Sequence, residues 1–106
     1  MNRIKPFVSH AGRRPLESQL QRRILIRLRK DFPGIFIYKA SDLFIVGLPD
    51  LIGCLDGKFF AMEVKAFYHK PTPLQQATLR KIVAAGGKAT VIFSVDDALD
   101  FLKNLY

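Results

Sequence analysis

Apolar residues recur every four positions across the first third of the chain, and this spacing predicts an amphipathic helix. The helix is expected to begin at Pro15, because proline favours the first helical position, and to end in the segment 31–34. Its apolar stripe consists of Leu16, Leu20, Ile24, Leu28 and Phe32. Most of the remaining helix surface is basic, and Ile26 within it is interpreted as a contact surface.

A hairpin is the clearest strand signal, because Asp56-Gly57 suits a two-residue turn in which both positions have positive φ. Such a turn fixes which residues of the two strands lie opposite one another. The expected pairs are Leu55 with Lys58, Cys54 with Phe59, Ile52 with Ala61, and Asp50 with Glu63. Lys65 falls on the face of Glu63 by two-residue alternation. One face of the hairpin therefore gathers two carboxylates and an ammonium group.

This arrangement predicts a divalent-metal site. Two carboxylates placed opposite one another repel unless a cation lies between them. Magnesium prefers oxygen ligands and usually takes one or two carboxylates, with water and substrate phosphate completing its shell. A neighbouring lysine can orient water or stabilise charge on a phosphate oxygen. The alternative is a surface hairpin with a solvated Glu63–Lys65 pair.

The other elements follow from local signals of the same kind. Strands are expected at 35–39 and 90–93, and helices at 73–85 and from about 95 to Asn104. The two later helices each open with a predicted capping box, formed by Thr72 with Gln75 and by Ser94 with Asp97. The order α-β-β-β-α-β-α favours an α/β or α+β fold in which helices flank a sheet.

One domain is expected at 15–106, preceded by a basic N-terminal arm at 1–14. The loop 40–49 contains the unusually apolar run Leu43 to Val46. This run is either a buried extension of a strand or an interface patch.

Glu17 projects into the middle of the apolar stripe of the first helix. A carboxylate aimed at a core needs a partner. If Glu17 lies instead in the first turn of the helix, its charge simply complements the helix dipole. The pattern alone leaves both interpretations open.

Positive charge is concentrated in the N-terminal third. Residues 1–30 hold nine Lys and Arg against the single acid Glu17, whereas residues 31–106 hold eight of each sign. A concentrated basic region favours a polyanionic partner, most often nucleic acid. The candidate DNA contacts are Arg13, Arg14, Arg22, Arg23, Arg27, Arg29 and Lys30. Neither base-specific recognition nor an aromatic surface for stacking single strands is evident.

Composition excludes several classes. No Cys/His cluster suggests zinc, and Cys54, expected as a buried free thiol, permits no intramolecular disulfide. No apolar run reaches membrane-spanning length, and the N-terminus lacks the apolar core of a signal peptide. We therefore expect a cytoplasmic protein in a reducing compartment, without a membrane partner or a small-molecule cofactor.

The combined pattern resembles the VRR-Nuc family within the PD-(D/E)xK nuclease superfamily. The most specific segments are Gly47-Leu48-Pro49-Asp50-Leu51-Ile52 and Met62-Glu63-Val64-Lys65, followed by Thr72-Pro73-Leu74-Gln75. The likeness runs from Glu17 to the last helix, and the chain length matches stand-alone, virus-type members. It implies a restriction-endonuclease-like core with a mixed central sheet, and a DNA endonuclease dependent on Mg²⁺ or Mn²⁺. It also implies a homodimer that acts on branched DNA such as Holliday junctions, in a phage-encoded setting.

The resemblance assigns roles to individual residues. Asp50, Glu63 and the backbone carbonyl of Val64 would bind the metal, and Glu17 would reach it directly or through water. Lys65 would position or activate the attacking water. Gln75 would support Lys65 or bind the scissile phosphate while also capping its helix.

Two other functions remain open. One is a restriction-like or nicking nuclease without branch preference, which would use the same residues. The other is a non-catalytic DNA-binding module that has kept the fold, although a pure binder has no need for Asp50, Glu63 and Lys65 together.

Overall fold

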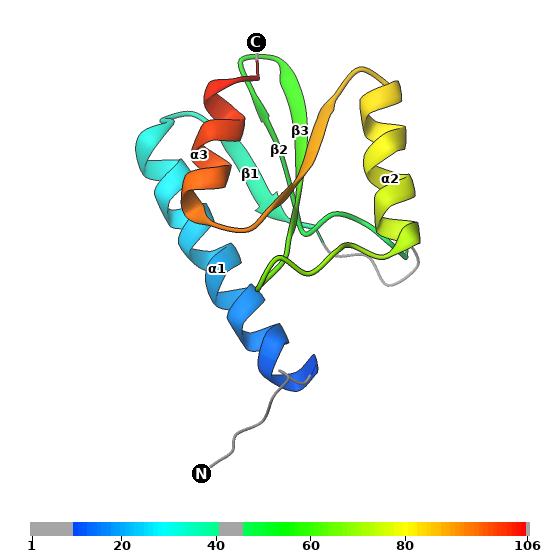
Figure 1. Ribbon diagram of the computed structural model, residues 1–106. Helices are drawn as coiled ribbons and strands as arrows, with labels where there is room; N and C mark the ends of the chain where they lie inside the picture. The colour runs from blue at the N-terminus through cyan, green and yellow to red at the C-terminus, as the bar shows by residue number, and fades with distance from the viewer. Residues whose placement is uncertain (1–9, 41–45, 106) are drawn as a thin grey trace.

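The computed structural model describes residues 10–40 and 46–105, which form a sheet with helices on both faces (Figure 1). The helices are α1 (His10–Asp31), α2 (Pro73–Ala84) and α3 (Val95–Lys103). The strands are β1 (Phe36–Lys39), β2 (Leu51–Leu55), β3 (Lys58–Val64) and β4 (Lys88–Ile92). The predicted order α-β-β-β-α-β-α and the mixed sheet are both confirmed.

The strands follow the order β1-β2-β3-β4 in space. The first three are antiparallel neighbours, and β4 pairs with β3 in parallel. Helix α2 connects these two parallel strands and covers them on one face, while α1 and α3 pack together on the other face (Figure 1). Parallel pairing places the ends of β3 and β4 side by side, where their following loops emerge.

The main core lies between the sheet and the α1–α3 pair. Three residues of the predicted α1 stripe, Leu20, Ile24 and Leu28, are buried. They meet the inward side chains of the sheet and of α3, chiefly Ile37, Leu51, Phe60, Met62, Val64, Leu99 and Leu102. Burial of these apolar side chains is the main driving force that holds α1 against the sheet.

The hairpin register is the predicted one. Leu55 lies opposite Lys58, and the pairing continues to Leu51 opposite Met62. Asp56 and Gly57 have φ values of 51° and 82°, as their turn requires. The register brings Asp50, directly before β2, toward Glu63 in β3.

Helix α1 begins at His10, so the prediction of a start at Pro15 is wrong. Proline favours the first helical position but does not define it. It removes a single N–H donor, and its fixed φ is compatible with a helix. Residues 10–14, assigned to the arm, are therefore helical. The rest of the arm, 1–9, lies outside the described residues.

The N-terminus of α3 also differs in detail from the predicted capping box. Ser94 caps the helix by accepting a hydrogen bond from the Asp97 N–H. The carboxylate of Asp97, however, accepts from the Phe93 N–H rather than from Ser94. The capping box of α2 is complete, with Thr72 and Gln75 bonded reciprocally.

Cys54 is half-buried, which corrects the expectation of a buried thiol. It lies opposite Phe36 and Phe59, on the sheet face that carries α2. Because α2 packs on β3 and β4, side chains of β1 and β2 on that face keep access to solvent. Phe36 and Tyr38 of β1 are exposed there.

Most of the apolar run Leu43 to Val46 lies outside the described residues. Val46 is described, and 76% of its surface is exposed. Within the described ranges, no helix is both long enough and apolar enough to cross a membrane.

Candidate active site

Asp50 and Glu63 meet at the end of the hairpin away from its turn. The Val64 N–H donates to Asp50 Oδ2 at 2.8 Å, which fixes the aspartate against β3. Glu63 is 1% exposed, and its carboxyl group lies close enough to that of Asp50 for each to shift the pKa of the other. The predicted cross-strand meeting of the two carboxyl groups is thus present, although regular pairing ends one residue earlier.

Lys65 completes this group. Its Nζ lies 3.5 Å from Glu63 Oε2, and its side chain is 14% exposed. The Lys65 N–H donates to the carbonyl of Ile92 at 3.0 Å, so β4 holds the backbone at this point. The alternative of a solvated surface pair is excluded, because both side chains of the ion pair are largely buried.

Burial raises the pKa of both carboxyl groups. The pKa of Glu63 rises to about 8, first because of burial and then because of the nearby charge of Asp50. The pKa of Asp50 is also raised by burial, although the Val64 N–H and Lys65 oppose the shift. Two carboxyl groups held together out of water favour a shared proton unless another cation replaces it.

One oxygen of Glu63 has no partner. Among the described residues, Oε1 is a buried acceptor that receives no hydrogen bond. A buried carboxylate oxygen without a donor is costly. A hard cation would satisfy it, and the oxygen donors of Asp50 and Glu63 are the type that Mg²⁺ or Mn²⁺ prefers. The side chains present therefore fit such a metal.

Glu17 reaches the same end of the sheet from α1. Its Oε2 accepts a hydrogen bond from the Ala66 N–H at 3.0 Å, directly after Lys65. Its charge contributes to the raised pKa of Asp50. Since α1 begins seven residues earlier, Glu17 does not lie in the first turn, and the helix-dipole interpretation is wrong.

Direct metal ligation by Glu17 stays a prediction. Within the described residues, no three Asp, Glu, His or Cys side chains are grouped as a ready metal site. Water between Glu17 and a metal bound at Asp50 and Glu63 is compatible with this geometry, because Mg²⁺ usually keeps several waters.

The sequence pattern did not identify Gln21 as a candidate site residue. It lies one helical turn after Glu17, on the same side of α1. It is 7% exposed, and its Oε1 is a buried acceptor without a hydrogen-bond partner in the described part of the chain. The spacing of four residues from Glu17 was the signal that could have identified it.

Gln75 is engaged in its capping box, where its Oε1 accepts from the Thr72 N–H at 2.8 Å. The predicted support of Lys65 is not among its hydrogen bonds. The metal-binding role of the Val64 carbonyl also stays a prediction.

The basic side chains of α1 that are described are exposed, namely Arg22, Arg23, Arg27, Arg29 and Lys30. Two of them have intramolecular partners. Arg27 pairs with Asp31 at 2.9 Å. Arg29 donates to the Ile37 carbonyl at 2.6 Å and lies over the Tyr38 ring. The side chains of Arg13 and Arg14 lie outside the described residues.

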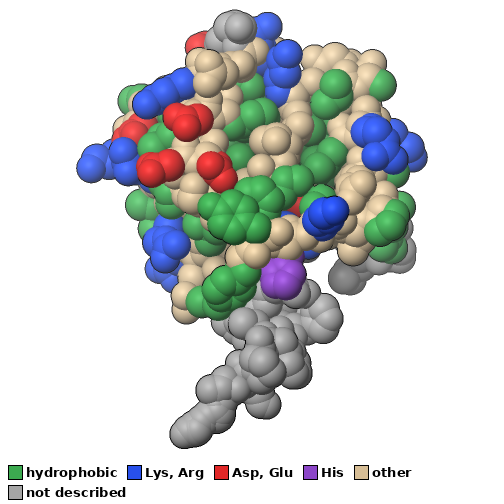
Figure 2. Space-filling view, viewed as in Figure 1, with side chains coloured by type: hydrophobic (Ala, Val, Ile, Leu, Met, Phe, Trp, Pro, Cys, Tyr) green, Lys and Arg blue, Asp and Glu red, His purple; other side chains and the backbone are tan. Residues whose placement is uncertain are grey.

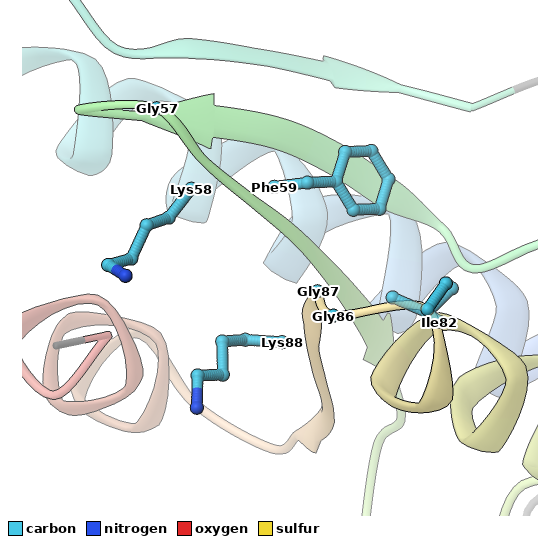
Figure 3. A pocket seen from close by; sticks show the side chains of 8 residues that line it. Gly57, Lys58, Phe59, Ile82, Gly86, Gly87 and Lys88 are labelled. Atoms are coloured by element: carbon cyan, nitrogen blue, oxygen red, sulfur yellow. The ribbon is translucent and has the colours of Figure 1, made fainter.

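A pocket of about 470 Å³ lies at the opposite end of the hairpin. It is lined by Gly57 of the hairpin turn, by Lys58 and Phe59 of β3, by the end of α2 and the glycines after it, and by Lys88 of β4 (Figure 3). Because Asp50, Glu63 and Lys65 are at the other end of these strands, this pocket is separate from the candidate active site.

Comparison with known proteins supports the observed fold and a nuclease-type domain. No protein-family model and no curated protein sequence matches the chain. A solved structure described as a "VRR_NUC domain" is 25% identical, with a TM-score of 0.71, and the match covers 85% of this chain and 97% of that one. A second, described as a "VRR_NUC domain protein", is 16% identical, with a TM-score of 0.68, and the match covers 84% and 86%.

The similarity to a solved VRR_NUC domain supports a nuclease-type domain, and the grouping of Asp50, Glu63 and Lys65 is compatible with one. These neighbours confirm the resemblance noted in the sequence at the level of the fold and support a VRR-Nuc-type domain. Its placement in the PD-(D/E)xK superfamily is consistent with this fold.

Proposed function

We propose that the protein is a DNA endonuclease dependent on Mg²⁺ or Mn²⁺, with Asp50, Glu63 and Lys65 as its centre. The observation that carries the proposal is the meeting of the half-buried Asp50 with the buried Glu63 beside the ammonium of Lys65, where Glu63 Oε1 has no hydrogen-bond partner among the described residues. A pure binding module would not need to keep two carboxyl groups together out of water.

The proposal assigns a role to each of these residues. Asp50, Glu63 and the Val64 carbonyl would hold the cation. When bound, the cation polarises the phosphoryl group and lowers the pKa of coordinated water. Lys65 orients the attacking water and stabilises negative charge on the phosphate oxygens. Glu17 holds the Ala66 N–H and thereby the segment that follows Lys65. Gln75 assists at the phosphate.

DNA is the substrate class that the charge distribution supports. The chain has a net charge of +8, and the exposed face of α1 carries Arg22, Arg23 and Lys30. Such residues bind phosphates and follow backbone geometry rather than base sequence. The contact extends to Arg13 and Arg14 in this proposal.

The active species is proposed to be a homodimer that prefers branched DNA, including four-way junctions. The domain is small, so burial of further apolar surface between two copies would stabilise it. Ile26 on α1, which is 60% exposed, is available for such a contact. A nuclease of the same chemistry without branch preference is the alternative.

A cleavage panel tests this proposal. Linear, flapped, three-way and four-way DNA are incubated with the full chain and Mg²⁺, Mn²⁺ or a chelator. Cleavage should require a metal and should be abolished by Glu63→Gln, while DNA binding persists. Asp100→Asn, which changes an exposed acid on α3, is the matched control and should cleave normally. Undiminished cleavage by Glu63→Gln would remove the site assignment.

A further inference from the structure

The segment directly after Lys65 forms a turn with unusual residues. The His69 N–H donates to the Ala66 carbonyl at 3.1 Å, and the two central residues, Phe67 and Tyr68, have φ values of 55° and 58°. This left-handed conformation normally selects glycine or asparagine. Two bulky aromatic residues hold it at an energetic cost, and such strain is concentrated at functional sites.

The rings of this turn are exposed. Phe67 is 57% exposed and Tyr68 is 79% exposed. Tyr68 is not isolated, because its ring packs against that of Phe93 in a tilted arrangement, with centroids 4.8 Å apart and planes inclined by 33°. Figure 2 shows hydrophobic side chains gathered on this face beside the histidine. The outer surface of Tyr68 is thus a rigid aromatic plane open to solvent.

Register places this plane next to the candidate active site. Val64 pairs with Ile92 across the parallel strands. The next residues along, Lys65 and Phe93, are therefore neighbours, and two-residue alternation puts Phe93 on the face of Glu63. Phe93 thus supports the Tyr68 ring from beside Lys65, rather than at a remote point of the surface.

The charges around the plane are asymmetric. The Phe93 N–H donates to the Asp97 carboxylate at 3.0 Å, and the first turn of α3 also contains Asp96. Along the chain, the turn is flanked by two basic residues, Lys65 and the exposed Lys70. A phosphate backbone is repelled by the acidic residues and attracted by the basic ones. A nucleobase, which is flat and neutral, can stack on the exposed surface of the Tyr68 ring.

We propose that Tyr68, supported by Phe93, stacks against an unpaired nucleobase of the DNA adjacent to the scissile phosphate. This proposal rests on the nuclease function above and specifies its substrate. A base within a duplex is already stacked on both faces, whereas a base at a flap, branch or single-stranded end offers a free face. The turn therefore selects DNA with unpaired nucleotides next to the cut.

The test uses a flapped duplex carrying 2-aminopurine, a base whose fluorescence is quenched by stacking, at successive positions around the branch. Binding is measured without metal, so that the DNA stays intact. The wild-type protein and Tyr68→Phe should quench the probe at an unpaired position. Tyr68→Ala should lose the quenching and bind flapped DNA about fivefold or more weakly, in the range measured for loss of base stacking. Its affinity for fully paired duplex should be unchanged.

Two further variants test whether the loss of quenching comes from destabilisation of the fold or from removal of any exposed tyrosine. Tyr68→Gly removes the ring but suits the positive φ, so it should lose quenching without any loss of thermal stability. Tyr38→Ala removes another exposed tyrosine, on β1, and should behave as wild type. Equal loss of affinity for paired and unpaired DNA, or quenching that survives in Tyr68→Ala, would overturn the proposal.

The outcomes also separate this proposal from the nuclease function. Metal-dependent cleavage by a wild-type protein that quenches no unpaired base would leave the function standing and remove the stacking site. Quenching by a protein that cleaves no DNA with any metal would support the stacking site and remove the nuclease function.

Discussion

Glu63 is the residue at which folding and the proposed metal binding would favour opposite protonation states. In the unfolded chain its carboxyl group loses a proton near its ordinary pKa of 4.5, whereas burial keeps that proton on the folded protein up to about 8. Between these values the folded state binds a proton that the unfolded state has released. Raising the pH in this window therefore lowers the free energy of unfolding. Asp50, whose pKa is also raised, acts in the same direction.

The expected result is a pH-dependent melting temperature. Without metal, the protein should melt several degrees lower at pH 8 than at pH 5.5, and Mg²⁺ should restore more stability at pH 8, because the cation favours the ionised carboxylates. Glu63→Gln should flatten both dependences, whereas Asp100→Asn should retain them. Calorimetry with and without chelator measures this. A wild-type profile in Glu63→Gln would show that another group controls the dependence.

Lys65 is expected to act on the transition state rather than on retention of the metal. Lys65→Ala should reduce kcat by about 100-fold or more, as does loss of a preorganised charge in other enzymes. Titration calorimetry should still detect Mg²⁺ binding, because both carboxylates remain. Lys103→Ala, at the exposed end of α3, is the control. Loss of metal affinity together with activity would show that Lys65 organises the carboxylates instead.

At the scale of elements, the Glu17 side chain of α1 makes a polar contact with the segment that follows β3. The Glu17 carboxylate accepts the Ala66 N–H, while the apolar side chains of α1 supply the packing against the sheet. The residue of α1 that contacts the segment after Lys65 is therefore different from the residues that stabilise the packing of this helix.

The variant Glu17→Gln tests whether the charge of Glu17 affects cleavage without affecting the stability of the fold. The amide oxygen of glutamine can still accept the Ala66 N–H, but the negative charge near Asp50 is lost. Cleavage should fall, while the melting temperature changes little, since Leu20 and Ile24 keep α1 in place. Ser18→Ala, next to Glu17 on the exposed side, serves as the control. Full activity in Glu17→Gln would limit Glu17 to holding the backbone.

Local signals explain which elements sequence reasoning could predict. The hairpin turn and the capping box of α2 depend on a few consecutive residues, and both were predicted at their observed positions. The start of α1 was not, because proline permits a helix on either side of itself. The meeting of Asp50 and Glu63 could be predicted, because the turn sets the register of the two strands. The contact between Tyr68 and Phe93 could not, because it depends on packing between segments distant in the chain.

At the scale of the whole molecule, the separation of its functional surfaces is informative. The basic face of α1, the carboxyl groups at the end of the hairpin and the exposed Ile26 lie on a domain of 106 residues. One metal site hydrolyses one strand at a time, whereas resolution of a four-way junction requires two cuts. A two-fold dimer holds two sites in a fixed relation that matches the symmetry of a junction.

A dimer of this kind predicts two linked results. Sedimentation should show a homodimer at working concentration, and Ile26→Asp should shift it toward monomer, because a charge on an apolar contact is costly to bury. DNA affinity should fall steeply with salt, as phosphate binding requires, while preference for four-way over linear DNA survives at matched salt. The Ile26→Asp variant should retain cleavage of single strands but lose paired cuts at a junction. A wild-type monomer that cleaves linear and four-way DNA equally well would leave the nuclease chemistry intact and remove the junction preference.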